Sequence, residues 1–316
     1  MIKENTSKKN HISNAVTDFL KKIEYEYNER KCIKTGFPSL DAKIQGFNAG
    51  ELILIGGYPC MGKAQFTMAT AYNIAKYFHN ENLENKQSKR CVLYLNLACS
   101  NDIFARDLLR SQMKMSIPDL SYISEEKMVE ITKFCKGINE LPLYCFDTIN
   151  DITGIRKAIN KLQQYQEIGC IFIDYLQMLE CEDKDFLISG LKELAMKYNV
   201  PVIAMTQLKK QREYKICTQP TVWDIRDYAN QSIGIADKIL LLHREHYYIH
   251  WNEPVKRKNE TDENFNKRHF EWKNKNEKLE HVCEIIIAKN DNFKYYNHHI
   301  KMYTDYISGY FAEYPK

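Results

Sequence analysis

The sequence predicts an α/β domain built on a mostly parallel central sheet with helices on both faces. From residue 51 onward, short apolar runs alternate with helical segments. The runs are continuous rather than alternating, which is typical of strands that are covered on both faces. A segment with two glycines also lies directly between the first run and a helical stretch, as in α/β domains that bind phosphate.

Seven apolar runs are expected to form the strands of this sheet. They cover residues 52–55, 91–97, 143–146, 170–173, 201–205, 239–242 and 284–287. Two further stretches, 297–303 and 309–314, are expected to close the sheet as an antiparallel hairpin at its edge.

The chain divides into residues 1–33, a polar N-terminus with one helix, and residues 34–316, a single large domain. The helix is expected over residues 11–30, where apolar side chains recur at helical spacing. Within the domain, residues 251–281 contain eight Lys or Arg, seven Asp or Glu and six Asn. This composition favours a solvated, mobile loop. The alternative is a basic arm that contacts nucleic acid, although the charges nearly cancel.

Composition excludes several classes of protein. The 316 residues are enough to bury a core without disulfide support. The apolar runs are too short to span a bilayer, so we expect no membrane partner. The N-terminus has no apolar signal segment, which favours the cytoplasm, and none of the ten cysteines forms a C-x-x-C pair. The net charge of +4 permits a nucleic-acid partner without arguing for one.

The strongest motif is G-Y-P-C-M-G-K-A at residues 57–64. Its spacing is that of the phosphate-binding loop G-x-x-x-x-G-K-[ST], whose backbone N–H groups surround phosphate oxygens while the lysine pairs with the β- and γ-phosphates. We therefore expect ATP or ADP as the ligand. The expected nucleotide-binding residues are Gly57, Pro59, Met61, Gly62, Lys63, Ala64 and Gln65.

The metal half of such a site is incomplete. The last position of the motif normally supplies a hydroxyl to Mg²⁺, and here it is Ala64, whose methyl group cannot bind a cation. Asp174, at the end of the apolar run 170–173, is the expected metal residue and would hold Mg²⁺ through water. Nucleotide binding is therefore expected to be weak or vestigial, and a role for Mg²⁺ is in doubt.

The motifs together resemble the RecA-like C-terminal domain of DnaB-type replicative helicases. The resemblance covers nearly all of residues 11–314 and is more specific than the phosphate loop alone. Its segments are T-G-F-P-S-L-D at 35–41, G-F-N-A-G-E-L at 46–52, D-Y-L-Q-M at 174–178, L-K-E-L-A at 191–195, T-Q-L at 206–208 and E-I-I-I-A-K at 284–289. It implies a RecA-like P-loop NTPase domain. The family's separate N-terminal helical domain is expected to be absent.

The departures from the family pattern fall on residues of the reaction. Where the family has the glutamate that polarises the attacking water, this sequence has Ala98. Where the family has K-x-R, whose lysine and arginine finger reach the neighbouring subunit's γ-phosphate, it has Lys289 followed by Asp291. The resemblance keeps four catalytic candidates. They are Lys63, Asp174, Gln207 as the γ-phosphate sensor, and Lys289. Loss of an arginine finger alone costs about 10³ to 10⁵ in rate, so we expect hydrolysis to be lost or nearly lost.

The resemblance also suggests contacts beyond the nucleotide. The family's DNA-contacting loop corresponds to Arg226 and Asp227, without the family's glycine, so these two are the DNA-binding candidates for single-stranded DNA. The helix over 11–30 resembles the family's linker helix, which packs on the adjacent subunit, so self-association through it is one expectation. Folding back onto its own domain is the other.

Three functions remain open from the sequence. The first is a DnaB-like protein of DNA replication with a degraded ATPase site, acting as a structural or regulatory partner of a replicative helicase or another replication protein. The second is an active ATP-dependent 5′–3′ DNA helicase whose missing groups are supplied by other residues. The third is a nucleotide-independent binding protein.

Overall fold

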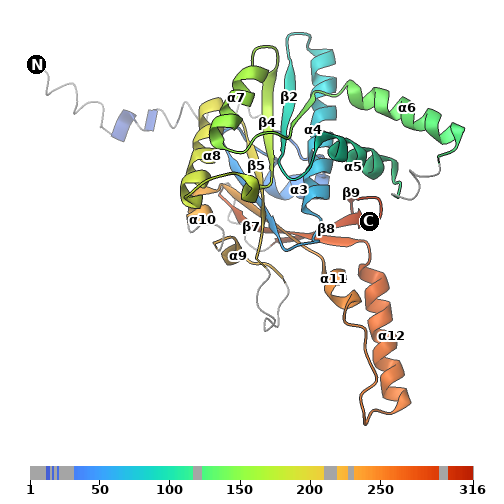
Figure 1. The fold of residues 1–316 in the computed structure, drawn as a ribbon. Coiled ribbons are helices and arrows are strands. Elements are labelled where there is room, and N and C mark those ends of the chain that lie inside the picture. The colour runs from blue at the N-terminus through green and yellow to red at the C-terminus, as the bar shows by residue number, and fades with distance from the viewer. Residues whose placement is uncertain are drawn as a thin grey trace, which may run out of the picture.

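A nine-stranded sheet organises the domain, with helices on both of its faces (Figure 1). The computed structural model describes residues 12–14, 16–17, 20, 32–116, 123–209, 219–226, 231–291 and 298–315. Its strands lie in the order β3-β2-β4-β5-β1-β6-β7-β8-β9. They are β1 (Leu52–Gly57), β2 (Arg90–Asn96), β3 (Leu143–Phe146), β4 (Glu167–Asp174), β5 (Val202–Gln207), β6 (Lys238–His243), β7 (Val282–Asn290), β8 (His298–Asp305) and β9 (Tyr310–Glu313).

The predicted strands are all confirmed, and so is the mostly parallel sheet. Strands β3, β2, β4, β5, β1 and β6 pair in parallel. Strands β7, β8 and β9 then continue the sheet in antiparallel pairing, so the predicted hairpin forms one edge. Each outermost strand, β3 and β9, is four residues long.

Helices cover the sheet on both sides. The helices α4 and α5 lie on one face, and α7 and α8 lie on the other (Figure 1).

Residues 12–14, 16–17 and 20 of the predicted N-terminal helix are helical, and the rest of that helix lies outside the described residues. The helices of the domain are α3 (Pro38–Ile44), α4 (Lys63–Glu84), α5 (Asn101–Met113), α6 (Glu125–Asn139), α7 (Ile152–Leu162), α8 (Lys184–Tyr198), α9 (Val222–Arg226), α10 (Ser232–Ile235), α11 (Glu245–His250) and α12 (Asp262–Leu279), with a 3₁₀ turn, η2 (Leu176–Met178).

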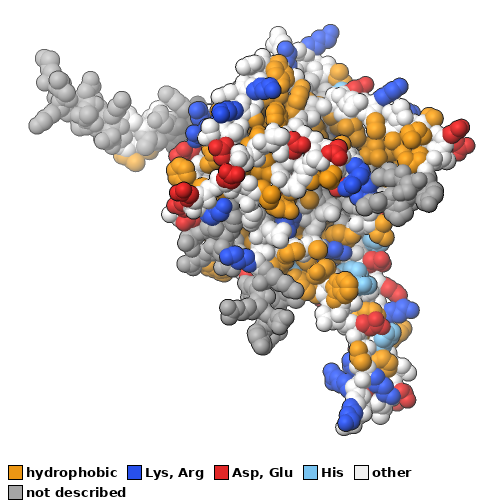
Figure 2. Space-filling view, in the orientation of Figure 1, with side chains coloured by type: hydrophobic (Ala, Val, Ile, Leu, Met, Phe, Trp, Pro, Cys, Tyr) orange, Lys and Arg blue, Asp and Glu red, His pale blue; other side chains and the backbone are white. Residues whose placement is uncertain are grey.

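The charged insertion is not the solvated loop that the composition suggested. It forms most of a helical arm, residues 245–280, in which the segment after α11 leads away from the sheet and α12 returns to it (Figure 1). Lys, Arg, Asp, Glu and His side chains alternate along this arm (Figure 2). The prediction of a loop was therefore wrong, and the reason lies in local signals that the composition does not record.

Those signals are an N-terminal cap on α12 and a few side chains of α12 that contact the rest of the arm. Thr261 caps α12 by accepting a hydrogen bond from Asn264 N at 3.3 Å, and two acidic residues in the first turn favour the positive end of the helix. Trp272 donates from its indole nitrogen to Ile249 O at 2.8 Å, and Arg268 pairs with Glu260. No residue of α12 is buried, so these polar contacts hold the arm together.

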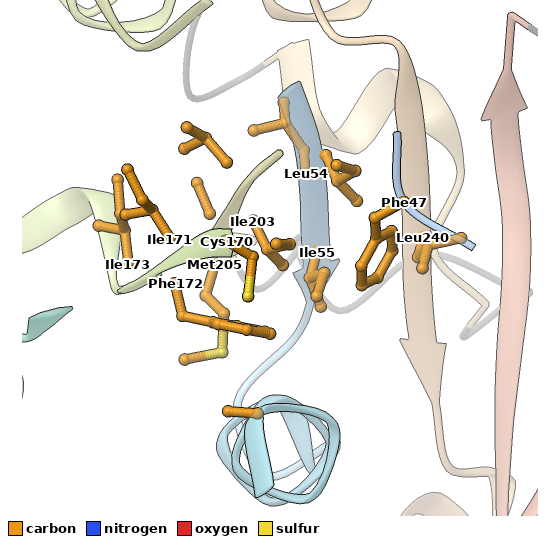
Figure 3. Packing of buried hydrophobic residues seen from close by; sticks show 14 of the residues in the cluster. Phe47, Leu54, Ile55, Cys170, Ile171, Phe172, Ile173, Ile203, Met205 and Leu240 are labelled. Carbon is orange, nitrogen blue, oxygen red and sulfur yellow. The ribbon is translucent and has the colours of Figure 1, made fainter. Parts of the chain in front are cut away.

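The core lies between the central strands and the helices on either face. Side chains of β1, β4 and β5 interdigitate there, among them Ile55, Phe172 and Ile203, which are at most 1% exposed (Figure 3). Complete burial of an aliphatic or aromatic side chain of this size contributes about 1.5 to 3 kcal/mol. Because both faces of these strands are covered, their central residues form continuous apolar runs, and this explains why the strands were predictable.

Among the described residues, no helix is both long enough and apolar enough to cross a membrane.

Candidate functional site

Most of the predicted site residues lie at the carboxyl ends of the parallel strands. These ends form one boundary of the sheet, called its carboxyl edge below. The loop from Gly57 follows β1, Asp174 ends β4, and Gln207 ends β5. Gly57 and Gln207 are register partners, so these two strand ends lie side by side. In open α/β sheets the crevice outside the carboxyl ends is where ligands bind.

The loop at residues 57–62 has the close approach and the backbone conformation of a phosphate loop. A Cβ at Gly57 would lie 3.2 Å from Leu242 O, so a side chain there would crowd the neighbouring strand. Gly62 has φ of +88° and caps the N-terminus of α4, a conformation that favours glycine. Lys63 then opens a helix of 22 residues, whose free N–H groups and dipole favour an anion.

Lys63, at the start of α4, contacts no acidic side chain among the described residues. Its ammonium donates to Gly57 O and Tyr58 O, both at 2.9 Å, and the side chain is buried. Burial lowers the pKa of Lys63 to about 8, because the charged form loses hydration, and the charge of Asp174 partly opposes that shift. The ammonium is thus held by two carbonyl groups at the place where a phosphate would otherwise meet it.

Asp174 is buried at the end of β4 and is only half satisfied. Its Oδ2 accepts a hydrogen bond from the Tyr94 hydroxyl at 3.2 Å, while Oδ1 has no hydrogen-bond partner among the described residues. Burial raises the pKa of Asp174 to about 7, against smaller lowering effects of Tyr94 and Lys63. Near neutral pH the carboxyl group therefore exchanges between its acid and its carboxylate form.

Tyr94 and Thr67 belong to the site and were not predicted from the sequence. Tyr94, on β2, is completely buried, and its hydroxyl oxygen lies 3.2 Å from Thr67 Oγ1 on α4. Thr67 Oγ1 also lies 3.1 Å from the carbonyl oxygens of both Lys63 and Ala64. The signal that could have identified Tyr94 is its hydroxyl within an otherwise apolar strand, since a buried hydroxyl needs a partner.

These residues do not fit a resident Mg²⁺ ion. At position 64 the helix presents a methyl group, and the hydroxyl of Thr67, one turn later, is engaged by backbone carbonyls and Tyr94. One oxygen of Asp174 remains without a partner. Mg²⁺ requires six oxygen ligands in near-ideal octahedral geometry, and one free carboxylate oxygen is a poor anchor for it.

A second set of unpredicted residues holds the phosphate loop from outside. Arg244, directly after β6, donates from Nη1 to Cys60 O at 3.1 Å and from its backbone N to Met61 Sδ at 3.3 Å. Its guanidinium carbon lies 2.9 Å from the centre of the Tyr306 ring, and that ring also faces Gly62. The sequence signal that could have identified Arg244 is an arginine close after a predicted strand, at the carboxyl end of the sheet.

The positions of the lost base and of the sensor lie at the same edge. Ala98 follows β2 and is exposed, and the adjacent Leu97 donates its backbone N to Asp174 O at 2.7 Å. Gln207 is exposed at the end of β5, where its backbone N–H donates to Gln177 Oε1 at 3.2 Å. The backbone of Gln207 thus lies beside Gly57, where the loop begins, and its sensor role stays a prediction.

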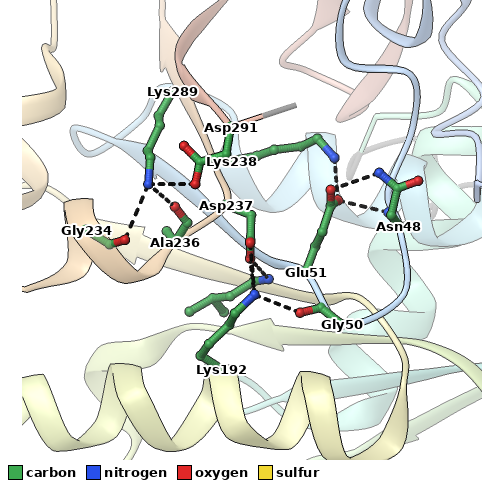
Figure 4. Close-up of polar contacts among 11 residues, drawn as sticks. Asn48, Gly50, Glu51, Lys192, Gly234, Ala236, Asp237, Lys238, Lys289 and Asp291 are labelled. Atoms are coloured by element: carbon green, nitrogen blue, oxygen red, sulfur yellow. Dashed lines mark hydrogen bonds and ion pairs between the residues drawn. The ribbon is translucent and has the colours of Figure 1, made fainter. Parts of the chain in front are cut away.

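Lys289 lies at the other edge of the sheet from the phosphate loop of its own chain, because β7 runs antiparallel to β6. Its ammonium contacts Asp291 at 3.0 Å and donates to Ala236 O at 2.5 Å (Figure 4). Lys289 therefore cannot reach a nucleotide bound to its own loop. A role toward a neighbouring chain stays a prediction.

Of the two DNA-binding candidates, Arg226 is the last residue of α9. Asp227 lies outside the described residues.

The family assignment follows from comparison with known proteins. The family model of the DnaB-like helicase C terminal domain matches residues 32–308. The chain belongs to this family. The predicted resemblance is thereby confirmed, while the roles of the individual site residues stay predictions.

Curated relatives of the chain include replicative DNA helicases. The chain is 30% identical to the replicative DNA helicase DnaB of Rickettsia typhi over 271 residues, 82% of this chain and 53% of that protein. It is 29% identical to a probable replicative DNA helicase of Trieres chinensis over 287 residues, 85% of this chain and 56% of that protein. The chain thus spans about half the length of these DnaB-type relatives.

Solved structures agree with the predicted RecA-like fold. A DnaB-like replicative helicase, described with its interactions with primase, superimposes with a TM-score of 0.73 at 20% identity, covering 97% of this chain and 67% of that one. A solved ATPase domain also gives a TM-score of 0.73 at 20% identity, covering 97% of this chain and 99% of that one. At this identity the likeness concerns the fold alone.

Proposed function

We propose that this DnaB-family protein binds ATP or ADP at the phosphate loop with little or no hydrolysis, and acts as a structural or regulatory partner in DNA replication. The observation that carries the proposal is the contrast within one edge of the sheet. The loop keeps Gly57, Gly62 and Lys63 in phosphate-binding geometry, whereas position 64 carries a methyl group and position 98 has no carboxylate.

The first experiment is an ATPase assay with Mg²⁺ and single-stranded DNA. We expect turnover at background, because the water-polarising group, the metal hydroxyl and the arginine finger are all replaced. The matched comparison is a triple variant, Ala64→Thr/Ala98→Glu/Asp291→Arg, which restores the three groups and should turn over faster than the natural protein. Turnover of the unaltered chain of about one per second or more would instead support the active helicase, the second reading.

Association with a replicative helicase is the second part of the proposal. A pull-down of the full chain with a DnaB-type helicase separates a replication partner from a nucleotide-independent binding protein of another process. If adding ATP or ADP abolishes capture of the helicase or is required for it, the association depends on the phosphate loop. Absence of capture with and without nucleotide would contradict this part of the proposal.

Self-association through the N-terminal helix is supported by two apolar surfaces. Ile12, Val16 and Leu20 recur every four residues and are each about half exposed or more. A mostly apolar pocket of about 350 Å³ lies between α5, α6 and β3, lined by Phe104 and Leu108 among others. Hydrophobic side chains gather over α6 on the same side of the molecule (Figure 2).

The measurement for self-association is light scattering of the full chain and of an Ile12→Asp/Leu20→Asp variant. We expect a concentration-dependent oligomer that shifts to monomer in the variant, because two charges in an apolar interface are unfavourable. An exposed surface pair, Lys258→Asp/Lys267→Asp, is the control for added negative charge. A hexamer that persists at micromolar concentration in the variant would exclude this role of the helix.

A further inference from the structure

The nucleotide site has the contacts of a phosphate cradle without those of a metal site. We infer that it takes its ligand as a metal-free nucleoside di- or triphosphate, with the Thr67–Tyr94–Asp174 hydrogen-bond chain occupying the place of the divalent cation. The inference rests on the nucleotide binding proposed above and adds the ionic form of the ligand.

The first step concerns the start of α4. In a phosphate loop the residue after the lysine directs a hydroxyl at the metal, and the methyl group of Ala64 offers no lone pair there. The next hydroxyl along the helix is that of Thr67, and it lies 3.1 Å from Lys63 O and from Ala64 O. Thr67 is 1% exposed and lies one turn inside the helix, so its hydroxyl oxygen is too deep to meet a cation above the N-terminus.

The second step concerns the carboxyl group. The Tyr94 hydroxyl donates its only proton to Asp174 Oδ2, and its oxygen lies 3.2 Å from Thr67 Oγ1, whose single proton is shared between Tyr94 and the carbonyls of its own helix. Tyr94 is fully buried between Phe104 and Phe172, with ring centroids 4.6 and 5.6 Å away, so its hydroxyl cannot swing aside to admit a hydrated ion. β2 is thereby tied to β4 and α4 by side-chain hydrogen bonds.

The third step concerns what is left for a cation. Asp174 Oδ1 is the remaining acceptor, and it faces no partner among the described residues. A single oxygen leaves five of about six coordination positions of Mg²⁺ to water and phosphate, which is close to the situation of a magnesium nucleotide in solution. The protein therefore gains nothing by binding the magnesium complex in preference to the free nucleotide.

The anion side remains intact. The free N–H groups at the start of α4 and the Lys63 ammonium are in place, and Lys63 has only the carbonyls of Gly57 and Tyr58 to give up. A polyphosphate without its metal carries more negative charge than the magnesium complex. The positive groups at this loop therefore favour the metal-free nucleotide more than a site that also binds the metal would.

The test is calorimetric binding of ADP and of ATP to the full chain, in EDTA and in excess Mg²⁺. We expect dissociation constants that agree within about twofold, or that are lower in EDTA, because the site offers the ion one oxygen at most. Binding that is about tenfold or more tighter with Mg²⁺ would overturn the inference and leave the proposed nucleotide binding standing. Absence of binding in both buffers would overturn both.

Variants locate the effect at the residues named. Ala64→Thr combined with Tyr94→Phe restores the helix hydroxyl and releases Asp174, and should make nucleotide binding about tenfold tighter in Mg²⁺ than in EDTA. The matched control is Ala105→Thr with Tyr198→Phe, an exposed alanine and a tyrosine whose hydroxyl bonds Asn160 on the other face. A double variant that is folded by circular dichroism and still indifferent to Mg²⁺ would overturn the assignment to these positions.

Discussion

The two edges of the sheet hold buried charges in opposite ways. At the amino ends of the parallel strands (the amino edge), buried Lys238 pairs with Glu51 and half-buried Lys192 pairs with Asp237, so both ammonium groups meet carboxylates (Figure 4). At the carboxyl ends (the carboxyl edge), the Lys63 ammonium donates to two carbonyl oxygens, and one oxygen of Asp174 has no hydrogen-bond partner among the described residues.

The difference separates charge that stabilises the fold from charge that is kept for a ligand. A buried ion pair leaves neither charge unsatisfied, whereas an isolated buried charge costs free energy unless something binds to it. The amino edge is therefore complete without a ligand. The carboxyl edge carries a cost that an anion at Lys63 would relieve, and substitutions should show opposite signs at the two edges.

The largest effect is expected at the amino edge. Glu51→Leu leaves Lys238 charged, fully buried and without its carboxylate, and should lower the free energy of unfolding by about 3 to 5 kcal/mol. Denaturant unfolding measures it. The double variant Glu51→Leu/Lys238→Met removes both charges and should recover most of the loss. A loss below about 1 kcal/mol in the single variant would mean that the pair does not hold this edge.

The opposite sign is expected for Asp174→Asn. Burial raises the pKa of Asp174 from its ordinary value of 3.8 to about 7 in the folded chain, so the folded state holds a proton that the unfolded state has released. Its contribution to stability is present below pH 4 and is lost as pH rises to about 7. Asp174→Asn cannot release this proton. Its free energy of unfolding relative to that of the natural protein should therefore rise by about 2 kcal/mol as pH increases from 5 to 8.

Thermal unfolding at several pH values measures this gain. Glu182→Gln, at an exposed carboxylate eight residues after Asp174 in the sequence, is the control and should show no such trend. A variant that is less stable than the natural protein at pH 8 would show that Asp174 stabilises the fold, as the carboxylates of the amino edge do.

A smaller effect is expected from the titration of Lys63. Its pKa of about 8 means that the ammonium is lost as pH rises through 8, so ADP binding should weaken about tenfold between pH 7 and pH 9. Lys63→Met should bind weakly with no such pH dependence. Affinity that is unchanged up to pH 9 in the natural protein would indicate that Lys63 does not meet the phosphate.

The smallest effect is expected at the rim of the amino edge. Asp291 is about half exposed, so its pair with Lys289 is largely hydrated, and Asp291→Asn should change the free energy of unfolding by less than about 0.5 kcal/mol. Denaturant unfolding beside the Glu51→Leu variant would show this contrast. A cost above about 1 kcal/mol would place Lys289 and Asp291 among the groups that hold the fold.

The parts of the site that the sequence predicted lie at the carboxyl end of a parallel strand or in the loop that follows it. Lys63, Asp174 and Gln207 each follow an apolar run, and the parallel sheet brings such ends to one edge. The contact of Tyr94 with Asp174 joins residues 80 positions apart, and that of Arg244 with Cys60 joins residues 184 apart. Contacts of this kind depend on strand register and side-chain direction, which a pattern of residue types does not contain.

The helical arm escaped prediction for a different reason. Its net composition is that of a loop, and no side chain of α12 is buried. The deciding features were the cap at Thr261 and the contact of Trp272 with Ile249 across the arm. Because few positions of α12 contact the rest of the arm, most of the helix is polar, and the sequence shows no clear apolar repeat at helical spacing.

The short outer strands of the sheet have a consequence for how copies of the chain meet. An exposed strand edge is a template for pairing with another chain and so for aggregation, and long flat edges are the most hazardous. Here β3 and β9 each offer four residues, about 13 Å of backbone. Such edges are poor templates for an intermolecular ladder, so specific contacts between molecules are left to helices and loops.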